Sequence, residues 1–428
     1  MTYGEAVRYI ERSIPNYQIK GKSAIRPGLS NIRKITNLIG KPQNSFKTIH
    51  IGGTNGKGTT ATSISNILIY NQLKVGLLTS PHIFSFRERI MVNGEKIEKK
   101  YIIEFLEKHM SVINKISPSF FELITAISFS YFKKKKVDIA IIEVGLGGKL
   151  DSTNIIKPLL SLITNIGLDH QNILGKNLKK IAIEKSGIIK KNSFFLKGKK
   201  QPTIDHIFEK RCNDLKIKFI QSSEKISIKT VSCSINNRLV IVFIDNYNFK
   251  VNLSNPTNYY LENLPGIILS SYYVLKKLKI ELSEKSFLGI TSENEKIKIN
   301  GRWQLHSKEP YIISDGCHNI DGFRYIIKEI NKYDFNKVYF ILGGTKEKDW
   351  DKISSELPTN FRYVITKPNS DRALPVSILS RLLKEKQLNF VIKKNVKESI
   401  EYAKLKTNKD DLIFIGGSLF LISQIDEK

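Results

Sequence analysis

The sequence predicts an α/β protein with two domains, a larger one built on a mostly parallel sheet and a smaller one of the same class. Apolar runs of four to seven residues alternate with helical patterns over most of the chain, as is typical of parallel sheets covered by helices. A glycine-rich turn joins the first of these runs to a helix, and unusual polar residues follow directly after the other runs. Because open α/β sheets bind ligands at the carboxyl ends of their strands, these polar residues are candidates for a site.

The first series of elements belongs to the larger domain. Its apolar runs predict strands at 47–51, 75–78, 138–144, 159–164 and 194–196. A β-rich stretch follows at 226–253, with Asn236-Asn237 as a hairpin turn, and a helical pattern covers 261–278.

A polar segment without clear periodicity, residues 284–301, separates the two series. We therefore expect a domain boundary near residue 297, with domains 1–296 and 297–428. The second series of apolar runs predicts a smaller, Rossmann-like C-terminal domain with strands at 311–314, 338–342, 363–366 and 412–415.

The net charge of +29 would suit a nucleic-acid partner if the basic residues gathered on one face. Lysines are instead spread over the whole chain, and the only tight run is Lys133 to Lys136. We interpret the charge as a Lys-rich solvated surface, which also tolerates anionic substrates, and expect no nucleic-acid partner.

The cysteines and the N-terminus indicate the compartment. Cys212, Cys233 and Cys317 show no CxxC spacing, so neither a disulfide framework nor a Cys-rich metal site is expected. The N-terminal segment places Glu5 and Glu11 among its apolar residues, unlike a signal peptide. No window approaches the ~18 apolar residues of a membrane span. We expect a soluble, cytoplasmic monomer without a membrane partner.

The turn after strand 47–51 carries the strongest chemical signal. It reads GGTNGKGTT over residues 52–60 and leads into a helix at 61–70. Glycines let backbone N–H groups approach phosphate oxygens, the helix N-terminus favours negative charge, and Lys57 can reach a phosphate. The strict GxxxxGK[ST] pattern is not met, because Gly58 separates Lys57 from Thr59, and an ordinary strand-to-helix turn is the alternative. We expect a P-loop-type domain that binds ATP through Asn55, Gly56, Lys57, Gly58 and Thr59.

The loop with its extra glycine, GTNGKGT, and the preceding SNIRKITNLIGKPQNSFKTIHIG resemble the folylpolyglutamate synthase/dihydrofolate synthase family of the Mur ligase superfamily. The resemblance runs from residue 3 to about residue 420, with the motifs in the family's order. It implies an ATP-dependent ligase that adds L-glutamate to dihydropteroate or to a reduced folate through an acyl phosphate. It also implies two Mg²⁺ ions and a central domain that holds both the ATP and the folate site.

The metal-binding residues implied by the resemblance each lie at or just after the end of a predicted strand. Ser80 stands in TSPH, Glu143 begins EVGLGGKLDSTN, and His170 ends the dipeptide DH. A carboxylate at the end of a buried strand is costly unless it is paired or binds a metal. Alone, the Ser-Pro pair would be an ordinary turn and the histidine a structural residue.

Lys185, in the motif EKSG, precedes Gly187 at a predicted helix end, where a lysine often only complements the helix dipole. The family's lysine in this motif is carbamylated, so the resemblance implies the same here. Lys57, His170 and Lys185 are the expected catalytic residues.

Further site residues come from other segments. The resemblance implies that ATP is also bound by Asn263 in NYYLENLPG, by Arg302 in GRW, and by Asp315 and His318 in DGCHN. Because three of these belong to the second domain, the ATP is expected between domains. The folate site is expected at Phe120, Phe121, Glu122, Leu150, Asp151 and Ser152, although core packing explains the two phenylalanines almost equally well.

Two other functions remain as alternatives. A cell-wall Mur ligase would share the chemistry but use a UDP-sugar acceptor; the extra Gly58 and the FFE segment argue against it. A nucleotide-gated nucleic-acid-binding protein would use the charge of +29, but it leaves the DH, EKSG and DGCHN segments without a role.

Overall fold

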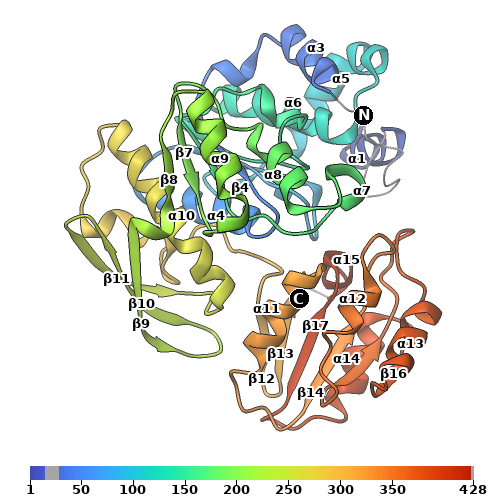
Figure 1. The fold of residues 1–428 in the computed structure, drawn as a ribbon. Coiled ribbons are helices and arrows are strands. Elements are labelled where there is room, and N and C mark those ends of the chain that lie inside the picture. Colours follow the sequence, from blue (N-terminus) through green and yellow to red (C-terminus); the bar gives the residue numbers. More distant parts are fainter. Residues whose placement is uncertain (15–27, 426–428) are drawn as a thin grey trace. The chain divides into compact units, whose positions relative to one another are not determined.

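The computed structural model describes residues 1–14 and 28–425 and divides into two compact units, Met1–Lys298 and Ile299–Lys428. Each unit contains a mostly parallel sheet covered by helices (Figure 1). The predicted α/β class is thus confirmed, and each unit is described by itself below.

An eight-stranded sheet forms the centre of the first unit. Its strands run in the order β4-β3-β2-β5-β1-β6-β7-β8, with β3 and β4 antiparallel to their neighbours and the others parallel. The bounds are β1 (Lys47–Gly52), β2 (Val75–Leu78), β3 (Ile90–Val92), β4 (Glu95–Lys96), β5 (Ile139–Glu143), β6 (Leu160–Ile163), β7 (Phe194–Lys197) and β8 (Phe219–Gln221). Because β1 lies between β5 and β6, the segments that follow these three strands emerge side by side.

Helices cover this sheet (Figure 1). α4 (Lys57–Tyr70) packs on β1, β2 and β5, and α10 (Asn258–Lys277) packs on α4, β6 and β7. α6 (Phe120–Lys135) packs on β2 and β3, with α3 (Ser30–Leu38) and α5 (Lys99–Ile116) beside it. α8 (Leu178–Ser186) and α9 (Pro202–Asp214) pack together over β6 and β7.

Two of these helices show why the sequence folds this way. α4 is buried without interruption from Thr59 to Leu68, which explains why its sequence of small and apolar residues has no polar face. α6 begins with a capping box, in which Ser119 and Glu122 satisfy each other's backbone N–H groups.

Shorter helical segments connect these elements. They are α1 (Tyr3–Arg8), η1 (Tyr9–Ser13), η3 (Pro42–Asn44), η4 (Phe86–Arg89), η5 (Ser152–Ile155), α7 (Gln171–Leu174), η6 (Ser222–Glu224) and η7 (Glu284–Ile290).

A three-stranded antiparallel sheet follows α9 and precedes α10. Its strands are β9 (Ile226–Cys233), β10 (Arg238–Ile244) and β11 (Tyr247–Leu253), with β10 in the middle. The predicted turn residues Asn236-Asn237 lie between β9 and β10. Val240, Val242 and Ile244 alternate along β10 and are buried, so one face of this sheet packs on the unit.

The second unit contains a six-stranded sheet in the order β12-β13-β17-β14-β15-β16, in which only β12 is antiparallel to its neighbour. The strands are β12 (Gln304–Lys308), β13 (Tyr311–Asp315), β14 (Val338–Leu342), β15 (Arg362–Ile365), β16 (Phe390–Ile392) and β17 (Leu412–Gly416). Its helices are α11 (Ile320–Ile330), α12 (Trp350–Ser354), α13 (Val376–Glu385), α14 (Val396–Lys404) and α15 (Leu419–Ile422).

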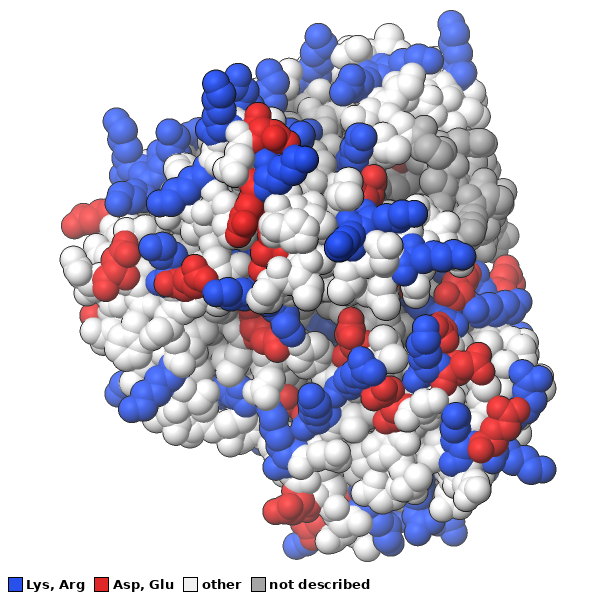
Figure 2. All heavy atoms as spheres, viewed as in Figure 1, with Lys and Arg blue, Asp and Glu red and all other residues white. Residues whose placement is uncertain are grey.

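Basic side chains are spread widely over the surface. Figure 2 shows Lys and Arg across the viewed face, with Asp and Glu between many of them. Exposed pairs such as Lys134–Glu104 at 3.2 Å and Lys200–Glu224 at 2.7 Å contribute little stability each. Within the described residues, no helix has both the length and the apolar character that a bilayer crossing requires.

Candidate active site

The loop between β1 and α4 requires glycine at two positions. Gly53 has φ +140°, and a Cβ atom there would lie 1.9 Å from Thr164 Oγ1. Gly56 caps α4 with φ +80°, and a Cβ atom there would lie 2.6 Å from the Asn263 side-chain amide. Both the backbone conformation and the close neighbours therefore exclude larger residues.

Hydrogen bonds hold this loop against the segment that follows β6. Thr54 N donates to Asn165 O at 2.9 Å, and Thr164 Oγ1 donates to Asn55 O at 2.7 Å. Gly167 N donates to Thr54 Oγ1 at 2.9 Å. Asn55 N also donates to this segment, at 3.1 Å from Asn165 Oδ1, whereas the first N–H groups of α4 lie at the helix start, where an anion binds well.

Two lysines lie against the loop. Lys57 Nζ donates to Thr54 O at 3.0 Å, and Lys57 is half-buried. Lys185 Nζ donates to Gly53 O at 2.7 Å, although Lys185 is only 4% exposed. Burial, and then the nearby Lys57 ammonium, lower the pKa of Lys185 to about 7. Lys185 thus has a substantial neutral-amine fraction near neutral pH.

Glu143 ends β5 beside the start of α4. Its carboxylate is 3% exposed and accepts a hydrogen bond from Ser80 N at 2.8 Å. A Cβ atom on Gly58 would lie 3.4 Å from Glu143 Oε2. The structure therefore brings together Gly58, Ser80 and Glu143, which the sequence assigns to the phosphate and metal sites.

His170 follows β6, on the other side of β1. It starts α7 with φ +49°, and its Nε2 atom lies 3.9 Å from Asp169 Oδ2. The His170 side chain is 30% exposed. In the parts of the chain that the structure covers, His, Cys, Asp and Glu form no group of three or more suited to a metal. Any metal bound here would therefore also need the serine hydroxyl, phosphate or water as ligands.

The glycine loop after Glu143 packs closely on the end of α8. Lys149 N donates to Glu184 O at 2.9 Å, and a Cβ atom on Gly148 would lie 2.9 Å from Lys185 Cα. A Cβ atom on Gly187 would lie 2.5 Å from Lys149 Cα. These approaches explain why the loop and the EKSG motif both contain glycine, and they fix Lys185 relative to the loop.

The six residues expected at the folate site have different environments. Leu150 is 48% exposed, and half-buried Phe121 lies close to Gly145, where a Cβ atom would be 2.3 Å from its ring. Phe120, Glu122 and Ser152 are buried: the first packs in the core, the second caps α6, and Ser152 Oγ lies 3.2 Å from Thr125 Oγ1.

Asp151 is the sixth of these residues and is 5% exposed. Its carboxylate accepts hydrogen bonds from Leu146 N at 2.8 Å, from Thr153 N at 3.0 Å and from Thr153 Oγ1. Burial raises the pKa of Asp151, and these donors oppose that shift.

Asn263, from α10, lies against the phosphate loop. Its Nδ2 atom donates to Tyr259 O at 2.8 Å, and its amide faces the Cα atom of Gly56. A long stretch of chain separates Asn263 from the loop, yet the packing of α10 on α4 brings them together.

The expected nucleotide residues of the second unit also gather at one place, the carboxyl end of β13. Trp303 N donates to Asp315 Oδ2 at 2.9 Å, and His318 Nδ1 lies 2.8 Å from Gly316 O. Arg302 Nη1 donates to Gly301 O at 2.8 Å and lies 2.4 Å from where a Cβ atom on Gly316 would be. Arg302, Asp315 and His318 thus form one cluster within this unit.

Arg89 is a buried arginine whose charge lies near Glu143, although sequence reasoning assigned it no role. It is 2% exposed, its Nε atom donates to His82 Nδ1 at 2.8 Å, and its guanidinium carbon lies 5.1 Å from the Phe120 ring centroid. Burial, and then Arg89 itself, lower the pKa of His82 to about 3, so His82 accepts as a neutral ring. Arg87 and Arg89 stand two residues apart in the sequence, and only the fold distinguishes the buried Arg89 from the partly exposed Arg87.

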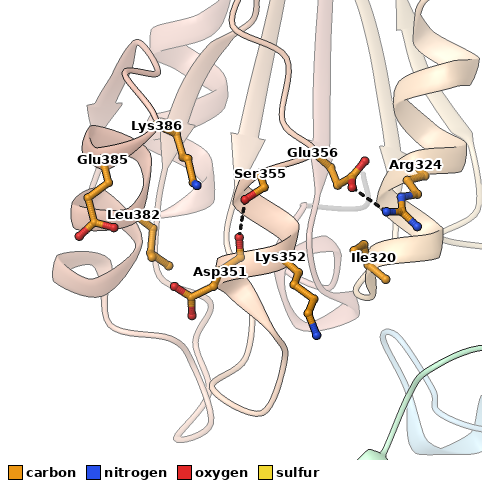
Figure 3. A pocket seen from close by; sticks show the side chains of 9 residues that line it. All are labelled: Ile320, Arg324, Asp351, Lys352, Ser355, Glu356, Leu382, Glu385 and Lys386. Atoms are coloured by element: carbon orange, nitrogen blue, oxygen red, sulfur yellow. Dashed lines mark hydrogen bonds and ion pairs between the residues drawn. The ribbon is translucent and has the colours of Figure 1, made fainter. Parts of the chain in front are cut away.

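The second unit also has an open, charged cavity of about 370 Å³ among α11, α12 and α13 (Figure 3). It is lined by Ile320, Arg324, Asp351, Lys352, Ser355, Glu356, Leu382, Glu385 and Lys386. Arg324 Nη2 pairs with Glu356 Oε1 at 2.7 Å on its wall. None of the residues expected in the active site lines this cavity.

Comparisons with known proteins cover both units. The Mur ligase middle domain matches residues 51–269, and the Mur ligase glutamate ligase domain matches residues 301–419. A dihydrofolate synthase/folylpolyglutamate synthase of Buchnera aphidicola subsp. Schizaphis graminum is 33% identical over 380 residues, which is 87% of this chain and 86% of the relative.

Solved structures are similar over nearly the whole chain. The folylpolyglutamate synthase of Thermotoga maritima is 29% identical with a TM-score of 0.81, over 99% of this chain and 95% of that chain. A Mycobacterium tuberculosis folylpolyglutamate synthase complexed with ADP and AMPPCP is 25% identical with a TM-score of 0.83, over 94% of this chain and 97% of that chain.

Proposed function

This chain belongs to the folylpolyglutamate synthase/dihydrofolate synthase family of Mur ligases, and on that premise we propose that it is an ATP-dependent ligase. It joins L-glutamate through an amide bond to dihydropteroate, to a reduced folate or to both. One observation supports this most strongly. The Glu143 carboxylate lies opposite Gly58 at the N-terminus of α4, so an anion site and a hard oxygen ligand stand side by side.

The proposed reaction needs ATP because a carboxylate is a poor acyl donor. A carboxylate oxygen of the acid attacks the γ-phosphorus of ATP. The bond between the γ-phosphorus and ADP breaks, so that an acyl phosphate forms and ADP leaves. The glutamate amine then attacks the acyl carbon, and phosphate leaves with its electron pair as the amide forms and a proton is lost. The protein's part is to position the phosphates and to stabilise their charge, through Lys57 and the N–H groups of Gly56, Gly58 and Thr59.

The residues present fit a divalent metal. Ser80 offers a hydroxyl and Glu143 a carboxylate, and both are hard oxygen donors. Because burying the Glu143 carboxylate is costly, a bound cation would stabilise it. We propose that Ser80, Glu143 and His170 hold two Mg²⁺ ions. When bound, these ions would neutralise the negative charge of the transferred phosphoryl group.

Lys185 is proposed to be carbamylated and to act with Lys57 and His170 in catalysis. Carbamylation requires a neutral amine, which adds to CO₂ with loss of a proton. Burial lowers the pKa of Lys185 to about 7, which supplies that amine at neutral pH. The modification would replace a buried cation with an anion next to the loop that Lys185 already contacts.

Four further residues are proposed to bind ATP. Asn263 already lies against Gly56 of the phosphate loop. Arg302, Asp315 and His318 come from the cluster at the end of β13 in the second unit. An arginine can bind phosphate oxygens through two N–H groups, and an aspartate can accept from ribose hydroxyls.

For the folate side, we propose Phe121 and Leu150 as contact residues, because they are the least buried of the six candidates. Phe120, Glu122, Asp151 and Ser152 would shape the site from behind. In this proposal residues 1–296 form the ATP-binding domain with the folate site, and residues 297–428 form the C-terminal Mur-ligase-like domain.

We further propose that the protein works as a monomer in the cytoplasm, without nucleic-acid or membrane partners. Cys212, Cys233 and Cys317 are free thiols in the structure, which suits a reducing compartment. On the face drawn in Figure 2, acidic side chains lie between many of the basic ones, unlike a continuous basic patch that binds nucleic acid. Sedimentation of the purified protein, alone and with duplex DNA, tests the monomeric state and the absence of nucleic-acid binding.

A substrate panel tests the proposed function. Purified protein is given ATP, Mg²⁺ and L-glutamate with dihydropteroate, a reduced folate or a UDP-muramoyl acid, and products are identified by mass. We expect phosphate release that needs both glutamate and a pteridine acid. ATP hydrolysis independent of glutamate, or an amide product only with the UDP-sugar acid, would overturn the proposal.

A further inference from the structure

A buried chain of three side chains connects the strand that leads into the phosphate loop with the glycine loop after Glu143. His50 lies in β1, Thr153 lies in η5, and Asp151 caps η5. His50 Nε2 lies 2.8 Å from Thr153 Oγ1, and Thr153 Oγ1 donates to Asp151 Oδ1. Neither His50 nor Thr153 has any exposed surface.

The direction of each hydrogen bond in this chain follows from its neighbours. The Thr153 hydroxyl has one proton, and it is used on the Asp151 carboxylate, which has only acceptors. His50 Nε2 must therefore donate to Thr153 Oγ1, and His50 Nδ1 carries no proton. That assignment agrees with the surroundings of Nδ1, which is buried without a hydrogen-bond partner in the described structure. A bare ring nitrogen there costs less than a buried N–H without an acceptor.

His50 keeps this single arrangement over the physiological pH range. Burial, and then Lys190, lower the pKa of His50 to about 3, so the ring stays neutral. Because His50 keeps one tautomer and always donates to Thr153, the three hydrogen-bonded side chains hold the Asp151 carboxylate in one position.

Asp151 transmits this position to the glycine loop. Its Oδ2 atom accepts from Leu146 N at 2.8 Å, and Gly145 N is also among its donors. Gly145 and Leu146 come directly after the strand of Glu143, and Gly145 touches Phe121. The same carboxylate therefore holds the backbone between the proposed metal ligand and the proposed folate contacts.

We propose that His50 and Thr153 are positioning residues, which fix Asp151 and through it the glycine loop 145–150 relative to the phosphate loop. This inference rests on the proposed function in one respect, namely that the glycine loop borders the site of the acid substrate. Among the residues that the structure describes, these three side chains have no hydrogen bond to the residues proposed to bind phosphate. Breaking their hydrogen bonds should therefore affect binding of the acid more than binding of ATP.

The test compares two substitutions at one position. Thr153→Val keeps the shape but removes the hydroxyl, which leaves His50 Nε2–H without an acceptor and Asp151 Oδ1 with only the backbone N–H of residue 153. Thr153→Ser keeps the hydroxyl. We expect Thr153→Val to raise KM for the pteridine acid about tenfold, as the loss of one buried polar contact would, with smaller changes in kcat and in KM for ATP. Thr153→Ser should restore most of the affinity.

A control separates positioning from general destabilisation. Thr36 is also fully buried, and its hydroxyl donates to Ile32 O at 2.8 Å within α3, so Thr36→Val loses a comparable hydrogen bond elsewhere. Equal KM values for the acid in Thr153→Val and Thr36→Val, or an equal rise in KM for ATP, would overturn the inference. If Thr153→Val does not fold, His50→Leu carries the same comparison because it removes only the first donor.

A second measurement keeps this inference distinct from the proposed function. Hydrogen exchange at the Leu146 amide reports directly on its bond to Asp151. We expect faster exchange in Thr153→Val than in Thr153→Ser and Thr36→Val. If the wild-type protein shows no glutamate-dependent phosphate release, the proposed function fails, while unchanged Leu146 exchange in Thr153→Val would refute the positioning role by itself.

Discussion

Gly58→Ala separates the stability of the phosphate loop from its function. Gly58 is the second residue of α4, and a Cβ atom there would lie 3.4 Å from Glu143 Oε2, at ordinary contact distance. Its backbone is not in the left-handed region, so alanine fits without strain. The added methyl group should stabilise the protein by up to about 0.5–1 kcal/mol, because alanine loses less backbone entropy than glycine in a helix.

The same methyl group should impair activity, because it takes space next to the carboxylate oxygen. Mg²⁺ is held at about 2.0–2.1 Å from its oxygen ligands in a strict octahedral arrangement and keeps several waters. A methyl carbon at 3.4 Å from Glu143 Oε2 would displace such waters or the phosphate oxygens beside them. We expect kcat/KM for ATP to fall at least tenfold, or about 1.4 kcal/mol of transition-state stabilisation.

The matched control is Gly4→Ala. Gly4 is likewise the second residue of a helix, α1, and a Cβ atom there would have no neighbour within 4 Å. Both variants are compared by urea unfolding and by phosphate release with ATP, glutamate and the pteridine acid. If Gly58→Ala were as active as Gly4→Ala, the phosphates and the metal could not lie between α4 and Glu143, and the reasoning would be refuted.

Three further predictions concern buried charged groups. Glu143→Gln keeps the shape of the side chain but removes its charge, so activity should fall on the order of 100-fold. The Mg²⁺ dependence of ATP affinity, measured by calorimetry, should also weaken. An unchanged Mg²⁺ dependence would contradict the proposed role of Glu143. Lys185 should take up isotope-labelled CO₂ increasingly as pH rises through its pKa of about 7, detected by NMR, whereas an equal signal in Lys185→Arg would place the carbamate elsewhere. Burial lowers the pKa of Lys197 to about 8, so the folded state loses this proton at a lower pH than the unfolded state does. The free energy of unfolding should therefore increase as the pH is raised beyond about 8, by at most about 1.4 kcal/mol per pH unit. Lys197→Met should lack this rise in urea unfolding at several pH values, and an identical pH profile would show that Lys197 does not cause it.

The central strands could be predicted because burial on both faces leaves a continuous apolar run. β2, β5 and β6 are buried along their whole length, and the structure confirms them, as well as β1 and β7, within a residue or two of the expected bounds. The edge strand β4 was not predicted, because it consists of Glu95 and Lys96, both exposed. Such a strand exists only because a neighbour offers its backbone, and no local apolar pattern marks it.

Only part of the site could be anticipated in the same way. The glycine loop, Lys57 and Glu143 lie in short motifs where residue types at fixed spacing imply chemistry. The proximity of Asn263 to Gly56 and the burial of Arg89 beside His82 depend on which helix packs where. Both depend on how helices and turns pack in the fold, which a single sequence does not display.

The sequence by itself determined that one apolar strand leads into a glycine-rich turn with Lys57 and that another ends at Glu143, because each of these is a local pattern of residue types. Only the tertiary structure decided that Ser80, Gly58 and Glu143 meet, and that His50, Thr153 and Asp151 form a buried chain. The physical reason is the strand order: β5 lies between β2 and β1, and β6 lies on the other side of β1, so distant segments come within hydrogen-bond distance, where burial then fixes each partner.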